Sequence, residues 1–404
     1  MSPSSDAADG MTKNGNNSKK RTSEPPGLHL VVDAVGNKYG GTAVVLAEVL
    51  ATALAHEAIG RITAFASPTD ERKVALPHDE RLTVVDVPEA EPALGRLWWA
   101  WQGLERRARS VGADVLLGLN GFGGSVGTMP AVVFLQQPLL YDRQALRRCP
   151  TALRWRMWAI RRLTRRSVRA ADHVMTQTDA IRQAAATEFG IALDKITAYP
   201  PSAPRLPEPR EPSSKLAAMR DAAAAGQAVL LYVGSDAPYK NLEIVAAALT
   251  KIAAERRPRW FATLSPESPV CRGGAAEALC ALSREELAQA YRLAGALVLP
   301  SLTETVGLPM LEAMRFGVPV AAADRPYAHA VCEDAAEWFD PLDADSCAAA
   351  LCRMLYDGPR RTELIARGLA LIARRDADDP LRRMIDKVVA ISEGHHPAAS
   401  ESQA

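Results

Sequence analysis

The sequence has few cysteines, few histidines and no long apolar run, and each shortage argues against a class of protein. Its six cysteines form no CxxC pair, so reduced cytosolic thiols are expected and a zinc site is not. No apolar run reaches the roughly 18–20 residues of a membrane-spanning helix. The first 26 residues are polar and lack the apolar core of a signal peptide. We therefore expect a cytoplasmic chain.

Charge is balanced over the whole chain but not along it. There are 48 Lys and Arg against 47 Asp and Glu, which argues against a generally basic nucleic-acid-binding protein. Residues 1–199 hold 25 basic and 20 acidic side chains, whereas the rest holds 23 and 27. A negatively charged partner is therefore expected to meet the first half.

Short β-type runs alternate with helical patterns in two successive blocks. An apolar run over 28–33 precedes a helical pattern over 42–56, and 229–234 precedes 241–256 in the same way. The other expected elements include a helix over about 91–111 and a strand over 131–135. Such alternation predicts parallel sheets covered by helices on both faces. Six prolines crowd into 200–212, where proline disfavours helix and interior strand and so indicates a linker.

The fold class predicted is α/β, with two Rossmann-like parallel-sheet domains that face a central cleft. Low apolar content predicts disorder at both ends of the chain. The predicted boundaries are a disordered tail over 1–26, a first domain over 27–199, a linker over 200–213, a second domain over 214–380, a C-terminal helix over 381–393 that packs back on the first domain, and a disordered tail over 394–404.

The most informative motif spans residues 300–312. A strand ends at Pro300, a loop carries Glu304, and a helix begins near Leu308 after Gly307 and carries Glu312. The first amides of a helix lack internal partners and carry partial positive charge, so a phosphate can dock there. One carboxylate could then reach a sugar hydroxyl and the other a ribose diol. The alternative is a loop acid and a solvated helix face.

These residues carry a resemblance to a known family. Glu304-x7-Glu312 followed by Ala-Met-Arg-Phe-Gly-Val-Pro-Val resembles the motif of retaining GT-B glycosyltransferases of glycosyltransferase family 4. Residues 231–242 resemble the first strand and phosphate-facing lysine of that family's donor domain, and 171–182 resemble its last N-domain strand and helix. The stretch after the paired glutamates is similar as well. The resemblance covers about residues 28–390 and is most specific over 300–341.

The resemblance implies a role for each matching residue. Lys240 would neutralise the departing diphosphate, Glu304 would contact the donor sugar, and Glu312 would bind the ribose. The implied catalytic residues are Glu304, Lys240 and Gln137. The implied donor-binding residues are Gly40, Gly41, Ser235, Lys240, Thr305, Val306, Gly307, Leu308 and Glu312. Alternatively, the glycine pair is a plain strand-to-helix turn and Lys240 is a solvated lysine at a helix start.

Two positions depart from the family pattern. Ser235 stands where many members have arginine, and Gln137 stands where many have histidine. Glutamine can hydrogen-bond a sugar hydroxyl but cannot change charge near neutral pH. No metal or cofactor is expected. Asp343-Ala-Asp345 resembles a metal-binding DxD, but its place before a helical pattern makes Asp345 a predicted N-cap.

Residues 143–171 form an unusually basic segment with ten arginines and no acidic residue. Trp155 and Trp158 lie within it, and arginine with tryptophan is typical of a helix that lies on an anionic membrane surface. The alternative is a solvated helix face packed by its own tryptophans. Nucleic acid is the least favoured partner.

The resemblance implies a retaining transfer from a nucleotide-diphosphate sugar to a glycan or lipid-linked acceptor of a surface polysaccharide. GDP-mannose is the favoured donor. Two alternatives stay open: a catalytically silent scaffold that binds a nucleotide sugar, and a GT-B sugar-nucleotide epimerase. An epimerase would need acid–base groups around the sugar, and none of the seven histidines lies in the phosphate motifs.

Overall fold

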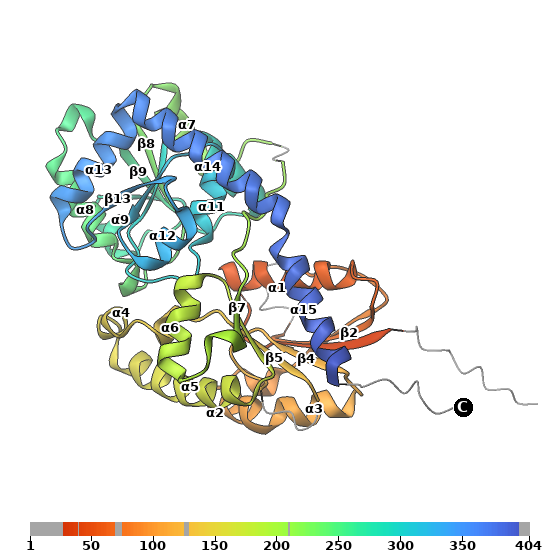
Figure 1. Cartoon of the computed structure of the whole chain (residues 1–404). Helices are drawn as coiled ribbons and strands as arrows, with labels where there is room; N and C mark the ends of the chain where they lie inside the picture. Colours follow the sequence, from red (N-terminus) through yellow and green to blue (C-terminus); the bar gives the residue numbers. More distant parts are fainter. Residues whose placement is uncertain (1–26, 39, 69–74, 125–128, 209–210, 396–404) are drawn as a thin grey trace, which may run out of the picture.

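The chain folds into two parallel β-sheets with helices on both faces (Figure 1). The computed structural model describes residues 27–38, 40–68, 75–124, 129–208 and 211–395. The two sheets confirm the predicted α/β class with two parallel-sheet units. The tail predicted over 1–26 lies outside the described residues, as do residues 396–404 of the tail predicted over 394–404. The last described helix extends to His395, so the predicted start of that tail at 394 was wrong.

The first sheet has seven strands in the order β3-β2-β1-β4-β5-β6-β7, every neighbouring pair being parallel. Its strands are β1 Leu28–Ala34, β2 Ile59–Ala66, β3 Leu82–Asp86, β4 Val115–Gly118, β5 Ala131–Leu135, β6 His173–Thr176 and β7 Ile196–Ala198. The helices that accompany it are α1 Gly40–Leu54, α2 Ala93–Trp98, α3 Leu104–Ser110, α4 Arg143–Arg147, α5 Thr151–Ala170 and α6 Asp179–Phe189.

The second sheet has six parallel strands in the order β10-β9-β8-β11-β12-β13. Its strands are β8 Val229–Tyr232, β9 Arg259–Ala262, β10 Glu277–Ala278, β11 Ala296–Leu299, β12 Val320–Ala323 and β13 Ala336–Phe339. Its helices are α7 Ala217–Ala224, α8 Leu242–Lys251, α9 Pro269–Arg272, α10 Arg284–Leu293, α11 Leu308–Arg315, α12 Pro326–Cys332, α13 Ala344–Tyr356 and α14 Gly358–Asp378.

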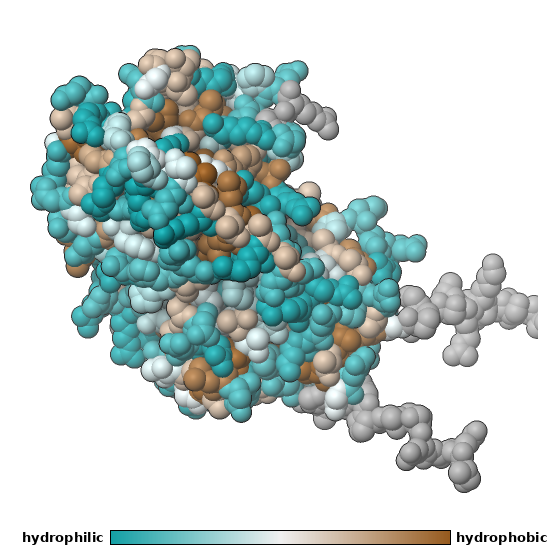
Figure 2. Space-filling model, turned by 45° about the horizontal axis from the view of Figure 1, so that its top comes forward, coloured by the Kyte–Doolittle hydropathy of each residue, from teal (hydrophilic) through white to brown (hydrophobic). Residues whose placement is uncertain are grey.

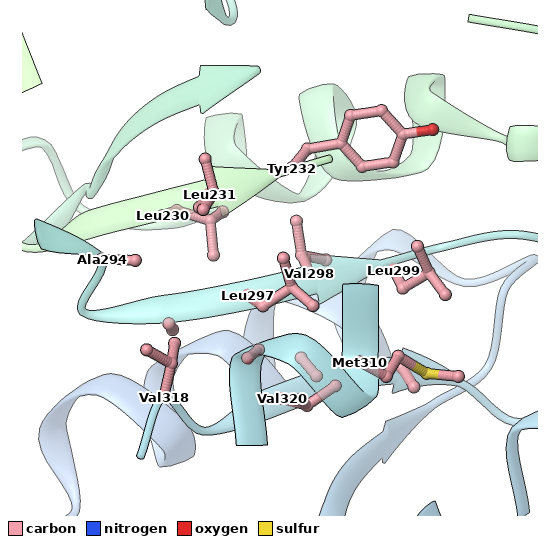
Figure 3. Close-up of a cluster of buried hydrophobic side chains, with 14 of the residues drawn as sticks. Leu230, Leu231, Tyr232, Ala294, Leu297, Val298, Leu299, Met310, Val318 and Val320 are labelled. Carbon is pink, nitrogen blue, oxygen red and sulfur yellow. The ribbon is translucent and has the colours of Figure 1, made fainter. Parts of the chain in front are cut away.

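Near-continuous apolar strands explain why both sheets are covered on two faces. Every residue of β4, β8 and β11 is buried, as parallel strands between two helical layers require. Figure 3 shows the centre of the second sheet, where Leu230 and Leu297 lie on neighbouring strands and Met310 of α11 packs nearby. This packing fixes the start of α11 against the end of β11.

The last helix returns to the first sheet. α15, Pro380–His395, leaves the second unit and lies along α1 and β4 (Figure 1). Met384, Ile385 and Val388 are fully buried in the core on that face of the first sheet. The chain therefore connects the two units twice, through the proline-rich segment and through the α14–α15 junction.

Several local expectations were wrong. The helix expected over 91–111 is divided by a π-helical turn at Trp99–Gly103, where Trp99 is fully buried against Phe65. Short strands β7 and β13 and helix α12 were missed, because three to seven residues give too little periodicity. The first helix begins at Gly40, so the glycine pair lies in its first turn rather than in the preceding loop.

Across the described residues, no helix is both long enough and apolar enough to cross a bilayer. On the face seen in Figure 2, hydrophobic residues emerge as separate patches between broad hydrophilic areas. This face thus combines polar and apolar areas. A concentration of positive charge lies on α4 and α5, where residues 143–171 hold ten arginines and no acidic residue.

Candidate active site

Lys240 and Glu304 form an ion pair at the carboxyl edge of the second sheet. Lys240 ends a short 3-10 turn, Pro238–Lys240, that follows β8, and Glu304 lies in the loop between β11 and α11. Only 13% and 12% of the two side chains are exposed. Tyr239 O accepts a 2.9 Å hydrogen bond from Leu302 N, which holds the two loops together. Lys240 is therefore not a solvated lysine.

The pair keeps Lys240 charged. Burial alone would lower the pKa of the ammonium, but the adjacent Glu304 carboxylate and then Tyr239 act against it, and the net shift is upward. An ammonium held beside a carboxylate can exchange that partner for a phosphate oxygen without losing its charge. This is the arrangement needed to stabilise negative charge on a leaving diphosphate.

Asn241 fixes the turn that presents Lys240. Its backbone is left-handed, with φ at 57°, a conformation that asparagine tolerates better than most residues. Its Nδ2 donates to Pro341 O at 2.8 Å, and its Oδ1 accepts from Arg148 Nη1 of the first unit at 2.8 Å. The sequence analysis missed this residue, although asparagine before a helical pattern was a usable signal for a left-handed turn.

Glu312 is buried one turn into α11. It is 6% exposed and accepts a 2.7 Å hydrogen bond from Tyr291 Oη. Burial raises the pKa of the carboxyl, and the tyrosine hydroxyl and Arg284 lower it by less. The alternative of a solvated helix face is therefore wrong for Glu312. Tyr291 was missed, because its position on α10 reads as ordinary core.

The start of α11 presents unpaired amides. Gly307 has φ at 75°, and a Cβ there would lie 2.9 Å from both Leu299 Cδ2 and Met310 Cε, so glycine is required. Within the described part of the chain, the amides of Thr305, Val306, Gly307 and Leu308 donate to no protein acceptor. With the helix dipole, these amides form a cradle suited to an anion.

The first turn of α1 faces this cradle from the other unit. A Cβ on Gly41 would lie 3.2 Å from Leu308 Cδ1, whereas Gly40 has φ at 56° and open space around it. Both residues lie at the start of α1, and the choice between a phosphate-binding role and a plain strand-to-helix turn stays open. At this approach α1 presents glycine backbone, and the Leu308 side chain of α11 lies against it.

The two departures from the family pattern lie apart from the ion pair's direct contacts. Ser235 is exposed, and its carbonyl accepts a 2.7 Å hydrogen bond from Tyr232 Oη. Gln137 caps the 3-10 turn Pro138–Leu140 by accepting from Leu139 N at 3.2 Å. Within the described structure, neither side chain forms a hydrogen bond or ion pair with Lys240 or Glu304, so these two residues are not part of the pair.

The Asp343-Ala-Asp345 motif caps a helix. The N-cap of α13 is Asp343, whose Oδ1 accepts from Asp345 N at 2.9 Å, so the expectation that Asp345 is the cap was off by two residues. Asp345 instead pairs with Lys251 at 2.8 Å. Among the residues whose placement is described, no three His, Cys, Asp or Glu side chains gather as metal ligands would.

A cleft lies between the two units along the later turns of α1. Its volume is about 660 Å³, and Glu48 of α1 faces Arg284 and Arg315 of the second unit across it. Burial raises the pKa of Glu48, Arg284 lowers it, and the nearby Glu312 raises it further. The cleft also contacts the two chain crossings, through Pro201–Ala203 and Asp379–Leu381. It provides room for a bound molecule between the units.

α5 carries the basic segment on the outside of the first unit. Trp155 and Trp158 are 66% and 53% exposed, and their rings meet edge to face. The two tryptophans therefore do not enter the core, and the alternatives of a membrane-facing and a solvated helix face both stay open. On the same unit, Leu94, Trp98 and Trp101 are also substantially exposed.

Comparison with known proteins agrees with this architecture. Residues 227–357 match the family model described as glycosyl transferases group 1. The O-antigen chain mannosyltransferase B of Escherichia coli is 31% identical over 216 residues, which cover 50% of this chain and 57% of that protein. The chain thus spans little more than half the length of the curated relatives it matches.

Solved structures match nearly the whole chain in fold. Sucrose-phosphate synthase from Thermosynechococcus elongatus superposes with a TM-score of 0.72 at 16% identity, over 91% of this chain and all of that chain. WaaG, a glycosyltransferase involved in lipopolysaccharide biosynthesis, superposes with a TM-score of 0.67 at 17% identity, covering 89% and 99%. Residues 227–357 are thus similar to the group 1 glycosyltransferases, and the chain has the GT-B fold of these solved structures.

Proposed function

We propose that the chain is a retaining glycosyltransferase that takes a sugar from a nucleotide-diphosphate sugar. The single observation that carries this proposal is the buried Lys240–Glu304 pair beside the unpaired amides of Gly307 and Leu308, with Gly41 facing them. One place in the molecule thus combines a cation, an anion cradle and a carboxylate for the sugar.

The proposed mechanism relies on positioning and on charge. The donor diphosphate lies between the start of α11 and the first turn of α1, where backbone amides and Lys240 bind its oxygens. Glu304 releases Lys240 to the phosphate and contacts the sugar, and Glu312 binds the ribose. As the glycosidic bond to phosphate breaks, Lys240 stabilises the leaving charge. A leaving phosphate oxygen takes the proton of the acceptor hydroxyl, which attacks on the same face of the sugar.

A thermal-shift panel with UDP-, GDP-, ADP- and CMP-sugars, each measured with EDTA, tests donor binding. A ligand at a hundred times its dissociation constant stabilises the folded state by ~2.7 kcal/mol, which a melting curve resolves easily. We expect a shift with one base, abolished in Lys240→Ala because the ammonium proposed to bind the diphosphate is removed. A shift of equal size in that folded variant would refute the placement of the diphosphate.

The finer identity of the substrates is also a proposal. GDP-mannose is favoured as donor, since one relative is named a mannosyltransferase of an O-antigen chain. The acceptor would be a glycan or a lipid-linked sugar of a surface polysaccharide. Transfer of radiolabelled mannose from GDP-mannose to a lipid-extractable product is expected. Exclusive use of a UDP-sugar would change the donor and leave the transferase class intact.

The enzyme is proposed to act as a peripheral protein at the cytoplasmic face of the membrane. The exposed Trp155 and Trp158 and the arginines of 143–171 support contact with an anionic surface. Cosedimentation with phosphatidylglycerol vesicles at low salt is expected and should decline as salt rises. No binding at low salt would end this part of the proposal.

A catalytically silent scaffold is the second candidate, favoured by Ser235 and Gln137 in place of a cation and a titratable side chain. Such a scaffold would show the thermal shift but no product. Turnover of the donor that binds separates the two, and release of free nucleotide without a glycoside would instead indicate hydrolysis or epimerase chemistry.

A further inference from the structure

A second anion-binding feature lies outside the cleft. Helices α4 and α5 and the end of α6 surround a hollow of about 540 Å³. Its polar lining consists of six arginines and a single carboxylate: Arg143, Arg147, Arg154, Arg161, Arg162, Arg165 and Glu188. Below, these residues with Leu146 and Trp158 are called the arginine groove.

The one carboxylate cannot neutralise this charge. Glu188 lies 3.5 to 3.7 Å from Arg161, Arg165 and Arg143, and so is shared among three guanidinium groups. In the parts of the chain that the structure describes, Arg147, Arg154 and Arg162 have no acidic partner. Like charges held this close repel one another, and an anion between them would relieve the repulsion.

The chemistry of the lining favours phosphate over other anions. Guanidinium groups are planar and donate paired hydrogen bonds that match phosphate oxygens. Several of them around one hollow provide more donors than a carboxylate can accept. A phosphate ester or a diphosphate, with more charge and more oxygens, fits this lining better.

An apolar surface adjoins the charged lining. A second hollow, of about 410 Å³, shares Arg154, Trp158 and Arg161 with the first and is lined in addition by Trp155 and Thr151. Arg162 lies over the Trp158 ring at 5.2 Å, so the same side chains have a cationic side and an aromatic side. An occupant that joins a phosphate to an apolar chain would contact both hollows.

The groove begins beside the proposed catalytic pair. Met157 and Cys149 at the start of the α5 region pack with Leu302, two residues before Glu304. Arg148, between α4 and α5, donates to Asn241, which follows Lys240. The groove therefore runs outward along the first unit from the place where the sugar would be transferred.

We propose that the arginine groove binds the phosphate or diphosphate group of an amphiphilic acceptor and holds its apolar tail against Trp155 and Trp158. This site is distinct from the diphosphate cradle at α11, and assigning its ligand to the acceptor rests on the proposed function. The two sites would hold donor and acceptor phosphates on opposite sides of the reacting hydroxyl.

Isothermal titration of the full chain with geranyl diphosphate tests the groove, with the donor cradle kept occupied by the nucleoside diphosphate that binds best. We expect one saturable event. Arg154→Ala combined with Arg162→Ala should weaken it at least tenfold. The matched control combines Arg156→Ala with Arg166→Ala, which removes equal charge from exposed α5 positions outside the lining, and should retain affinity within twofold.

Inorganic pyrophosphate distinguishes the two sources of the ligand. Weaker binding than geranyl diphosphate, with Trp155→Ala removing the difference, would assign the site to a tailed lipid phosphate. Equal binding of both, still dependent on Arg154 and Arg162, would assign it to a free phosphate group. No saturable event, or equal weakening in the two double variants, would overturn the proposal.

Failure of the groove can be told from failure of the proposed function. Thermal shift with the nucleotide sugar reports the α11 cradle and should be the same in both arginine double variants. A lost nucleotide shift with intact geranyl diphosphate binding would refute the donor site alone. An intact shift without geranyl diphosphate binding would refute the groove alone.

Discussion

The two halves of the molecule share a plan but differ in how their interiors are built. In the described second half, buried apolar residues join into one continuous core that includes both β11 and α11. In the described first half, they fall into separate clusters on the two faces of the sheet and around β5 and β6. The first half also carries the excess positive charge, on α4 and α5.

This difference indicates that the two halves have different roles. A single core fixes Glu312 and the start of α11, which suits the proposed role of this half in donor binding. The first half has several smaller cores and a helix with exposed tryptophans, so its surface can vary without disturbing the donor side. The family model matches only within the second half, at 227–357, in agreement with this division.

The largest expected effect comes from truncating matched core leucines. Leu117 on β4 and Leu297 on β11 are both fully buried near the middle of their sheets, and each Leu→Ala change should cost about 2–5 kcal/mol. Leu117→Ala should lower the melting temperature of the first half, and Leu297→Ala should lower the melting temperature of the second half. Scanning calorimetry should resolve the two transitions. A bound nucleoside diphosphate should raise the temperature of the second transition more than that of the first, because most of its proposed contacts lie in the second half.

One shared transition, shifted equally by both leucine variants, would contradict the comparison. The two halves would then unfold as one unit, and the proposed domain boundaries near residues 200–213 and 380 would have no energetic meaning.

Lys240→Ala should strongly lower turnover, because it removes the cation of the proposed catalytic pair in the second half. Loss of one preorganised charge at a leaving group costs ~2.7–4 kcal/mol of barrier, so turnover should fall about a hundredfold or more. Glu304→Ala should do the same. Because either change leaves a partly buried charge unpaired, rates are to be measured on protein shown by circular dichroism to be folded. A folded Lys240→Ala enzyme with near-normal turnover would remove this residue from the mechanism.

Acid sensitivity should concentrate in the first half, at His173. Burial, reinforced by Lys387 and Lys195, lowers the pKa of this imidazole from 6.5 to about 4. Between these values the unfolded chain binds a proton that the folded chain does not, so stability falls as pH drops from 6.5 to about 4. Below about 4 both states are protonated and the loss is complete.

His173→Gln should remove that part of the loss of stability in acid. The glutamine can keep a hydrogen bond to Thr197, whose hydroxyl lies 3.0 Å from the histidine Nε2. Urea unfolding at pH 7 and pH 5 measures the difference. The matched control is His78→Gln, at an exposed position between β2 and β3, which should leave the wild-type pH dependence. Equal pH dependence in wild type and His173→Gln would show that His173 titrates normally.

Tyr291→Phe should have a smaller, selective effect on donor binding. It removes the hydroxyl that donates to Glu312, and a hydrogen bond to a charged or buried group is worth about 1 kcal/mol, or roughly fivefold. We expect KM for the donor to rise by that factor with kcat nearly unchanged. Tyr356→Phe, the same change far from the cleft, is the control. A fall in kcat alone would mean that Glu312 acts on the reacting sugar rather than on the ribose.

The sequence predicted long elements well and side-chain partners poorly. Strand β5 was predicted with the bounds it has, because a run of five apolar residues ends at a proline turn. The π-helical turn at Trp99 was not predicted, because the helical periodicity of a sequence does not reveal one extra residue in a turn. Short elements such as β7 depend on partners far along the chain, which a local pattern does not contain.

In the candidate site, too, the sequence predicted the residues better than their contacts. Spacing and the resemblance placed Lys240, Glu304 and Glu312 together, but not the ion pair between the first two or the tyrosine that binds the third. Tyr291 lies 21 residues before Glu312, on a helix whose pattern looks like ordinary core. The roles of Gln137 and Ser235 stay predictions. The arginine groove needed the structure, because α4, α5 and α6 meet only in the fold.

The smallest effect separates the two aspartates before α13. Asp343 accepts from Asp345 N as the N-cap, so Asp343→Ala should cost about 1 kcal/mol of stability. Asp345 has only an exposed pair with Lys251, so Asp345→Ala should cost no more than about 0.5 kcal/mol and leave turnover unchanged. Urea unfolding and donor turnover measure both. If Asp345→Ala lost much of its turnover and added Mn²⁺ partly restored it, the motif would bind a metal. The interpretation of this motif as a helix cap without a part in the reaction would then be wrong.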